Sequence, residues 1–388
     1  MASSQNSSET YSGFEQGPIR PPSEANSLLI RVTRNCPWNK CTFCPVYKGK
    51  TFSRRPVAHV KQDIDAVHRY VEMLQGETGA SDRISHLVVR DIAARVSPED
   101  EAAFYASVNW FSGGLRSVFI QDANSLIVKP EALVEILTHL RKRFPWADRI
   151  TSYARSHTIA RISDGDLKSI SDAGLNRIHI GLESGSDAVL KKVRKGATKA
   201  LHIKAGVKVK AAGMELSEYV MPGLGGQELS EIHARETADA LSQINPDYIR
   251  LRTLAIPGRA PLSEAYQSGA FRKCTDLMMA KEILLFIQSL DGITGTLTSD
   301  HILNLFQEVE GVFPHDREKM TQILSAFLEM PPARQCLYQV GRRLGIFHGL
   351  SDMDSPQRVR KVERVCRENG ITPENADEVV DALMKRFI

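Results

Sequence analysis

Short strand-like segments alternate with helical segments through the first two thirds of this 388-residue chain. Between about residues 27 and 260, six short apolar runs are each followed by a segment whose apolar residues recur every three or four positions. Such alternation is typical of a parallel sheet with right-handed crossovers. Because the strands are short and apolar, we predict an α/β protein with a partial (β/α)6 barrel of the TIM type. The six predicted strands are residues 28–32, 118–120, 150–153, 178–180, 216–221 and 248–254.

Two segments interrupt or precede the predicted barrel, which spans residues 27–260. Residues 1–26 are rich in Ser, Pro and Glu, so we expect a flexible N-terminal tail. Residues 77–113 do not follow the strand–helix alternation. They predict an insertion with a strand at 84–89 and a helix near 98–110.

The last third of the chain is predicted to be helical. We expect a helical extension over 261–350 and a C-terminal two-helix piece over 351–388, because turn-forming residues lie between them. The predicted helices are residues 276–290, 301–309, 316–328, 333–343, 355–368 and 374–386.

Composition narrows the class of protein. Apolar residues make up 42% of the chain and charged residues 25%, which is typical of a globular protein. No apolar run approaches the roughly 20 residues of a membrane-spanning helix, and no secretory signal is visible, so we expect a cytoplasmic protein without a membrane segment. The net charge of +4 is too weak to predict binding to nucleic acid.

Three of the six cysteines fall within nine residues. Cys36, Cys41 and Cys44 have the spacing Cys-x4-Cys-x2-Cys directly after the first predicted strand. In a long chain without a secretory signal, clustered thiols indicate a metal rather than disulfides. Three thiolates on one loop can bind three corners of a cubane iron–sulfur cluster, which leaves the fourth iron open for a substrate or cofactor. Loops at the carboxyl ends of barrel strands are also where β/α barrels build active sites.

Two plainer interpretations of these cysteines stay open. The first is a structural zinc site that His59 or Cys274 would complete as fourth ligand. The second is three unrelated buried cysteines. The six strand–helix repeats behind the loop argue against both, because zinc ribbons are usually small and β-rich.

The cysteine segment resembles the cluster motif of the radical S-adenosylmethionine (SAM) superfamily, in a variant with four residues between the first two cysteines. Phe43, just before the last cysteine, also matches. The resemblance implies a [4Fe-4S] cluster on Cys36, Cys41 and Cys44, with SAM on the free iron. It implies that SAM is cleaved reductively to a 5′-deoxyadenosyl radical, which abstracts hydrogen from a small or medium-sized organic substrate.

The resemblance carries further expectations about partners and subgroup. It implies an oxygen-sensitive protein and an electron donor such as flavodoxin or ferredoxin. The helical C-terminus is similar to the branch of anaerobic coproporphyrinogen oxidase-like and elongator-type radical SAM proteins. The resemblance covers about residues 27–260.

Residues near the carboxyl ends of the predicted strands are the candidates for SAM binding that the resemblance implies. Asp122 holds the position of the family's Gly-Gly-Glu-type segment, although that segment is absent here. Glu183, in a Gly-Leu-Glu-Ser-Gly stretch, would contact SAM, and Lys195 would reach its carboxylate; a Gly-rich turn with solvated lysines is the alternative. The candidates are Phe43, Gln121, Asp122, Tyr153, Arg155, Glu183, Ser184, Lys195, Gly223 and Gly225.

Three basic residues are candidates for substrate binding or catalysis. Arg250 and Arg252 share one face of the last predicted strand, where they would bind an anionic substrate or form a structural ion pair. His301 could donate a proton near the substrate, although a histidine in such a place more often caps a helix.

The sequence leaves two alternative functions open. A radical SAM enzyme that modifies tRNA would keep the chemistry, but the C-terminus shows no β-rich RNA-binding module and the net charge is weak. A non-catalytic protein that binds zinc through its three cysteines is the other.

Overall fold

The computed structural model describes residues 9–78 and 84–384. The chain divides into two compact units. Unit 1 comprises residues 1–37, 49–179 and 211–214, and unit 2 comprises 38–48, 180–210 and 215–388. The strand order is β1-β4-β5-β6-β7-β8-β9-β10, and the boundary between the units falls within β6 (Arg177–Glu183).

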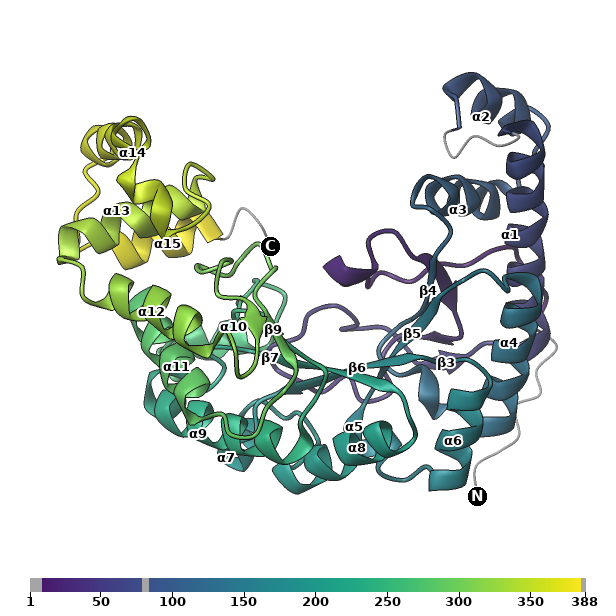
Figure 1. Ribbon diagram of the computed structural model, residues 1–388, viewed down its shortest axis with the longest axis horizontal. Helices are drawn as coiled ribbons and strands as arrows, with labels where there is room; N and C mark the ends of the chain where they lie inside the picture. Colours follow the sequence, from purple (N-terminus) through teal and green to yellow (C-terminus); the bar gives the residue numbers. More distant parts are fainter. Residues whose placement is uncertain (1–8, 79–83, 385–388) are drawn as a thin grey trace. The chain divides into compact units, whose positions relative to one another are not determined.

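Unit 1 contains parallel strands flanked by helices. Strand β4 (Ser117–Gln121) pairs in parallel with β1 (Leu28–Arg31) on one side and with β5 (Arg149–Ala154) on the other. Helix α1 packs against α3 and α4 (Figure 1). The short antiparallel strands β2 (Thr33–Arg34) and β3 (Ser53–Arg54) lie on either side of the cysteine segment in the chain. The helices of this unit are α1 (Val57–Thr78), α2 (His86–Ala93), α3 (Glu101–Ser112), α4 (Pro130–Arg143), α5 (Ser156–Ile159) and α6 (Asp164–Asp172).

The described part of the N-terminal segment, residues 9–26, makes specific contacts within unit 1 and is not a free tail. Glu24 is fully buried, where its carboxylate lies 3.3 Å from Arg149 and 3.5 Å from His179. Glu15 forms ion pairs with Arg31 and Arg34 at 2.6 and 2.8 Å. The expectation of flexibility therefore fails over this range, because a few charged residues in a polar segment find buried partners.

Unit 2 continues the parallel arrangement and adds the C-terminal helices. Strand β8 (Tyr248–Leu251) pairs in parallel with β7 (Glu215–Val220) and β9 (Thr296–Thr298), and β10 (Gly311–Val312) is antiparallel to β9. Helices α9 and α11 lie side by side (Figure 1). The helices are α7 (Asp187–Lys192), α8 (Lys199–Ala211), α9 (Gly226–Ile244), α10 (Leu262–Gln267), α11 (Asp276–Ser289), α12 (Arg317–Leu328), α13 (Pro332–Arg343), α14 (Pro356–Glu368) and α15 (Ala376–Met384).

The predicted α/β class is confirmed, and the six predicted strands correspond to β1 and β4–β8. No strand pairing closes the sheet within the part of the chain that the structure describes, so the architecture is a partial barrel. Strands β9 and β10 extend it beyond the six repeats.

Two predicted elements are wrong. The strand expected at 84–89 is helix α2, which Ser85 caps by accepting a hydrogen bond from the Val88 amide at 3.3 Å. The helix expected at 301–309 is irregular. There the Asn304 amide group binds the backbone at the end of β8, donating to the Leu251 carbonyl at 2.8 Å. Such a side-chain contact competes with helical hydrogen bonding.

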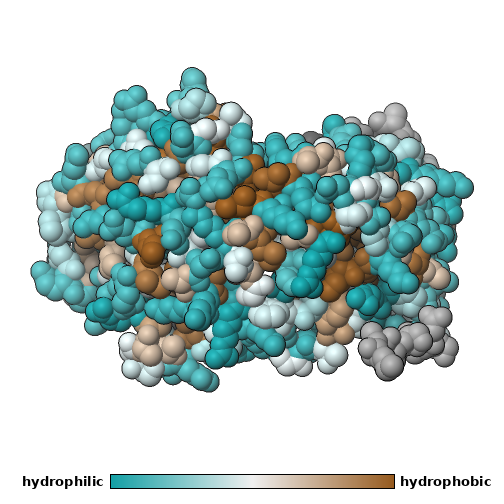
Figure 2. Space-filling view, turned by 90° about the horizontal axis from the view of Figure 1, so that it is seen from below, coloured by the Kyte–Doolittle hydropathy of each residue, from teal (hydrophilic) through white to brown (hydrophobic). Residues whose placement is uncertain are grey.

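Hydrophobic side chains reach the surface in small patches among hydrophilic ones on the face seen in Figure 2. Across residues 9–78 and 84–384, no helix is both long and apolar enough to cross a membrane.

Candidate functional site

The segment that carries Cys41 and Cys44 is anchored within unit 2 by hydrogen bonds to backbone carbonyls and amides. The Thr42 amide donates to the Val193 carbonyl at 3.0 Å, and the Leu262 amide donates to the Thr42 carbonyl at 2.9 Å. The indole nitrogen of Trp38 donates to the Arg194 carbonyl at 2.8 Å. These bonds fix the backbone around Cys41 and Cys44 against the segment that follows α7.

The clustered cysteines differ from the other three in exposure. Cys36, Cys41 and Cys44 are half-buried, whereas the remaining three are buried, and none of the six forms a disulfide. Cys41 and Cys44 pack against a buried apolar cluster that contains Phe43, Val193 and Met221. A half-buried thiol beside an apolar wall is accessible to a ligand and still shielded from bulk water. The buried set is Cys274, Cys336 and Cys366.

The three cysteines fit an iron–sulfur cluster by their chemistry, because thiolates are the ligands that such clusters bind. Among the described residues, no three His, Cys, Asp or Glu side chains converge as closely as one metal ion requires. A cubane cluster holds its thiolates further apart than a single ion does. His59 lies against the Tyr11 ring at 5.5 Å, and Cys274 is a buried thiol whose pKa burial raises to about 12.

Glu183 and Lys195 form an ion pair beside this segment. Lys195 Nζ lies 3.0 Å from Glu183 Oε1, and both side chains are 13% exposed. Lys195 Nζ also lies 5.8 Å from the centre of the Phe43 ring, and the Cys41 thiol lies 4.0 Å from the Lys195 carbonyl. Gly181 leaves the space that the pair fills, because a Cβ there would lie 2.3 Å from Glu183 Oε1. The predicted candidates Phe43, Glu183 and Lys195 are therefore brought together.

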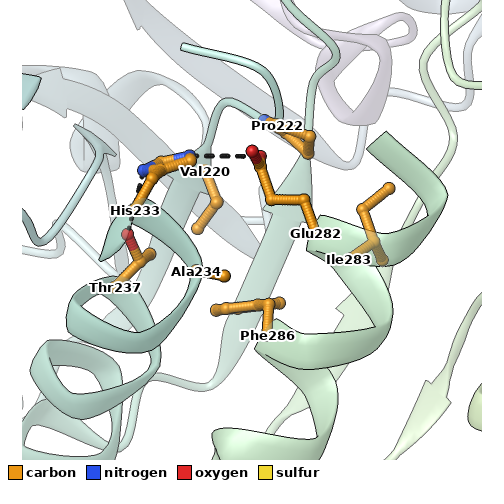
Figure 3. A pocket seen from close by; sticks show the side chains of 8 residues that line it. All are labelled: Val220, Pro222, His233, Ala234, Thr237, Glu282, Ile283 and Phe286. Atoms are coloured by element: carbon orange, nitrogen blue, oxygen red, sulfur yellow. Dashed lines mark hydrogen bonds and ion pairs between the residues drawn. The ribbon is translucent and has the colours of Figure 1, made fainter. Parts of the chain in front are cut away.

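A buried polar network joins the segment after β6 to the Gly-rich turn after β7. His233, on α9, contacts the Ser184 hydroxyl through Nδ1 at 2.8 Å and the Met221 carbonyl through Nε2 at 3.1 Å. Its Nε2 lies 3.6 Å from Glu282 Oε1 on α11. Figure 3 shows His233 between Thr237 and Glu282. The network holds two of the predicted SAM-binding segments at fixed positions.

The Gly-rich turn is shaped by Glu282. The Gly223 amide donates to Glu282 Oε1 at 2.7 Å, and the Ser230 hydroxyl donates to its other oxygen. Gly223 has a φ of +84°, a conformation in which a side chain would be strained. Burial raises the pKa of Glu282, while the neighbouring His233 opposes the shift. The backbone of Gly223 and Gly225 is thus held in a defined turn on the carboxyl side of β7.

Comparison with known proteins identifies the family. The sequence pattern of the radical SAM superfamily matches residues 30–237. This chain belongs to the radical SAM superfamily. The superfamily match contains the cysteine segment, the Glu183–Lys195 pair and the Gly-rich turn. Members of the superfamily use a [4Fe-4S] cluster and SAM, and these are the cofactors of this chain.

The solved structures that match this chain are distant in sequence. Elp3 of Methanocaldococcus infernus is 16% identical, with 48% of each chain covered and a TM-score of 0.39. Methylornithine synthase (PylB) is 15% identical, with 71% of this chain and 67% of that chain covered and a TM-score of 0.42. The methyltransferase TsrM of Kitasatospora setae is 15% identical, with 64% and 38% covered and a TM-score of 0.42. This chain spans about half the length of the Elp3 chain. No curated protein matches the sequence.

The radical SAM candidates of unit 1 lie at the ends of β4 and β5. The Gln121 side chain binds the N-terminal segment, accepting from the Gly17 amide at 2.7 Å and donating to the Ile19 carbonyl at 3.0 Å. Asp122 is fully buried, has a φ of +71° and pairs with Arg31 at 2.6 Å. Gln121 and Asp122, which the resemblance assigns to SAM binding, therefore make structural contacts within unit 1.

The other two candidates of unit 1 are Tyr153, near the end of β5, and Arg155, directly after β5. The Tyr153 ring lies 5.3 Å from Phe119 and 5.4 Å from His179, centre to centre. The Arg155 amide donates to Asn124 Oδ1 at 3.0 Å, which fixes the backbone after β5. The structure therefore locates Tyr153 and Arg155 at the predicted strand end.

The three basic candidates of unit 2 have different surroundings. Arg250 is buried. Its guanidinium donates to the Ser217 hydroxyl at 3.1 Å and lies 3.4 Å from the Asp300 carboxylate. It therefore forms a structural ion pair, which was the alternative to binding an anionic substrate. Arg252 is exposed. Burial, together with the charge of Arg252, lowers the pKa of His301 to about 4. His301 is then neutral near pH 7, where a neutral imidazole is a weak proton donor.

Sequence reasoning missed His233, Glu282 and Glu218, which are all buried. The one sequence signal is weak: Glu282 directly precedes the apolar run Ile283 to Phe286, but Lys281 stands beside it as an ordinary partner would. A lone histidine on a helix carries no comparable signal.

Proposed function

We propose that this chain is a radical SAM enzyme that acts on a small or medium-sized organic substrate. The observation that carries the proposal is the anchored cysteine segment beside the Glu183–Lys195 pair. In members of the superfamily the reduced cluster supplies the electron that cleaves SAM to methionine and a 5′-deoxyadenosyl radical, which takes hydrogen from the substrate. We further propose cytoplasmic action with a donor such as flavodoxin or ferredoxin.

In this proposal the cysteines, Lys195 and Phe43 have different roles. Cys36, Cys41 and Cys44 would ligate three irons, and their half-burial suits a cluster with one accessible corner. Lys195 would bind the carboxylate of SAM, since a cation held in place is the natural partner of an anionic chain end. The apolar ring of Phe43 would shield this side of the site from water.

The remaining candidates would position the cofactor. The turn that contains Gly223 and Gly225 would lie along the adenine, and its buried anchor on Glu282 supports a fixed geometry. Ser184 would act through its bond to His233. Gln121, Asp122, Tyr153 and Arg155 are proposed at the SAM side of unit 1, with the first two acting through the backbone that they fix.

The test is anaerobic reconstitution with iron and sulfide. We expect a visible absorption band that bleaches with dithionite, and 5′-deoxyadenosine formed from SAM. Cys41→Ala should abolish both, whereas Cys366→Ala, which alters a buried cysteine outside the motif, should retain both. A protein that contains one zinc ion, no sulfide and no SAM cleavage would contradict the proposal and support the zinc-binding alternative.

A further inference from the structure

Arg252 is a cation that the proposed function leaves without a role. It directly follows β8, and its side chain is exposed. Across residues 9–78 and 84–384, its guanidinium forms no ion pair and no hydrogen bond. Arg250, two positions earlier, differs, because it is buried and lies 3.4 Å from the Asp300 carboxylate. Of the two arginines, Arg252 is therefore the one whose charge is available to an anion.

Backbone hydrogen bonds place Arg252 beside the Gly-rich turn. Its amide donates to the Val220 carbonyl at 2.9 Å, and the Leu254 amide donates to the Pro222 carbonyl at 3.0 Å. Leu254 belongs to the buried apolar cluster that contains Phe43 and against which the cysteine segment packs. Arg252 thus stands at the carboxyl ends of β7 and β8, where parallel β/α folds bind their ligands.

A hydrogen-bonded turn holds His301 at the same strand end. The side-chain amide of Asn304 donates to the Leu251 carbonyl at 2.8 Å, and Asn304 Oδ1 accepts from the Thr253 amide at 2.9 Å. The Asn304 backbone amide donates to the His301 carbonyl at 2.9 Å. The turn that carries His301 is therefore tied to the residues on either side of Arg252.

His301 is oriented as a neutral hydrogen-bond donor. The Leu303 amide donates to its Nδ1 at 3.3 Å, so the proton of the neutral ring is on Nε2. Burial and the charge of Arg252 lower the pKa of His301 to about 4, so the ring is neutral near pH 7. Its Nε2 makes no hydrogen bond to any residue that the structure describes. The turn thus offers an N–H donor, and the strand end beside it offers a cation.

We propose that Arg252 and His301 bind a carboxylate group of the substrate, with the guanidinium supplying the charge and the imidazole Nε2–H a further hydrogen bond. This inference rests on the proposed function, because it names the substrate class of that enzyme, an organic acid. Asp300 is balanced by Arg250 and the His301 ring is uncharged, so the site offers a single positive charge. One charge balances a carboxylate, whereas a phosphate dianion would need a second cation.

The test uses butanoate as a small carboxylate and butanamide as its uncharged counterpart. Phenylglyoxal, which reacts with accessible guanidinium groups, is added anaerobically to the reconstituted protein, and mass spectrometry of the digested chain gives the rate at each arginine. Butanoate at about twice its Kd should slow the reaction of Arg252 about threefold, because only the unoccupied site reacts. Butanamide should not slow it. Arg259, an exposed arginine of the same loop, should react equally fast in all cases.

Two variants of His301 test the second hydrogen bond. His301→Ala removes the donor, so about tenfold more butanoate should be needed to protect Arg252. His301→Gln keeps a side-chain N–H and should recover part of this protection. Equal protection of Arg252 in the wild type and in His301→Ala would remove His301 from the site and overturn the inference as stated.

The wild type alone gives three results that would overturn the inference. These are equal rates at Arg252 with butanoate and butanamide, stronger protection by inorganic phosphate than by butanoate, and protection by SAM. The third would mean that Arg252 binds the cofactor, whose carboxylate the proposed function assigns to Lys195. Formation of 5′-deoxyadenosine from SAM tests the proposed function separately. If SAM is cleaved and butanoate does not protect Arg252, this inference alone fails; if butanoate protects Arg252 and SAM is not cleaved, the carboxylate site stands and the proposed function fails.

Discussion

Burial sets the protonation of individual acids in unit 2. Glu218 and Glu282 are both buried, and desolvation raises the pKa of each. Glu228, by contrast, is exposed, and its hydrogen bond with Arg272 lowers its pKa. Burial disfavours a charged carboxylate unless a partner compensates. Glu282 has such partners in Gly223 and Ser230, whereas the carboxyl oxygens of Glu218 make no hydrogen bond of normal geometry among the described residues and the charge of Lys195 only opposes the shift.

The raised pKa of Glu218 predicts how stability depends on pH without ligand. The folded state holds this proton more tightly than the unfolded state, so the stabilisation is fully present below the unfolded pKa of about 4.3. It is lost as pH rises through the folded pKa. Glu218→Gln should therefore lose less stability than the wild type as pH rises above about 4.3, as measured by urea denaturation at a series of pH values. Parallel pH profiles for the two proteins would contradict a raised pKa of Glu218.

At the scale of elements, helices α9 and α11 carry the side chains that hold the loops. His233 and Glu282 come from different helices, and together they contact Ser184, Met221 and Gly223. A loop that is hydrogen-bonded to a packed helix pair has fewer conformations available before the ligand arrives. Because the turn is already ordered, SAM binding does not lose conformational entropy by ordering it.

This arrangement predicts the effect of removing the anchor of the turn. Glu282→Ala takes away the acceptor of the Gly223 amide and of the half-buried Ser230 hydroxyl, and it leaves the buried His233 without this partner. We expect a cost of about 1–3 kcal/mol in stability. SAM affinity should fall by about tenfold or more, corresponding to about 1.4 kcal/mol. Equilibrium binding of SAM to the reconstituted protein checks this.

Two further variants make the test of the anchor specific. Glu282→Gln keeps one carbonyl oxygen for the Gly223 amide and should recover part of the affinity. Lys281→Ala alters an exposed neighbour on the same helix and should change nothing. Unchanged SAM binding in Glu282→Ala would show that the turn needs no anchor.

The elements were predictable where the signal is local. The strand–helix alternation identified β1 and β4–β8, because the periodicity of apolar residues and the residues that cap helices are local features of the sequence. The irregular segment around Asn304 was missed because its partners, Leu251 and Thr253, lie about fifty positions away. The same holds for the bond between His233 and Ser184, which are 49 residues apart. The cysteine motif could be recognised from the sequence, because its three cysteines are close together in the chain.

At the scale of the whole molecule, the superfamily match ends at residue 237, within α9. The residues beyond it include α11, whose Glu282 shapes the Gly-rich turn inside the matched region. They also include α15, where Asp381 pairs with Lys273 at 2.6 Å. Helix α11 of unit 2 is therefore built into the same packed structure as the matched segments of that unit, and α15 is tied to the chain just before α11.

Since SAM binds only the folded, cluster-loaded chain in this proposal, it should raise the stability of the whole protein. A ligand at one hundred times its Kd adds about 2.7 kcal/mol. Thermal unfolding followed anaerobically should show a Tm that rises with SAM concentration in the reconstituted wild type and in Cys366→Ala. The rise should be absent in Cys41→Ala and in wild type whose cluster has been removed with a chelator, and it should return after reconstitution. An equal rise in the cluster-free protein would mean that the iron contributes nothing to SAM binding.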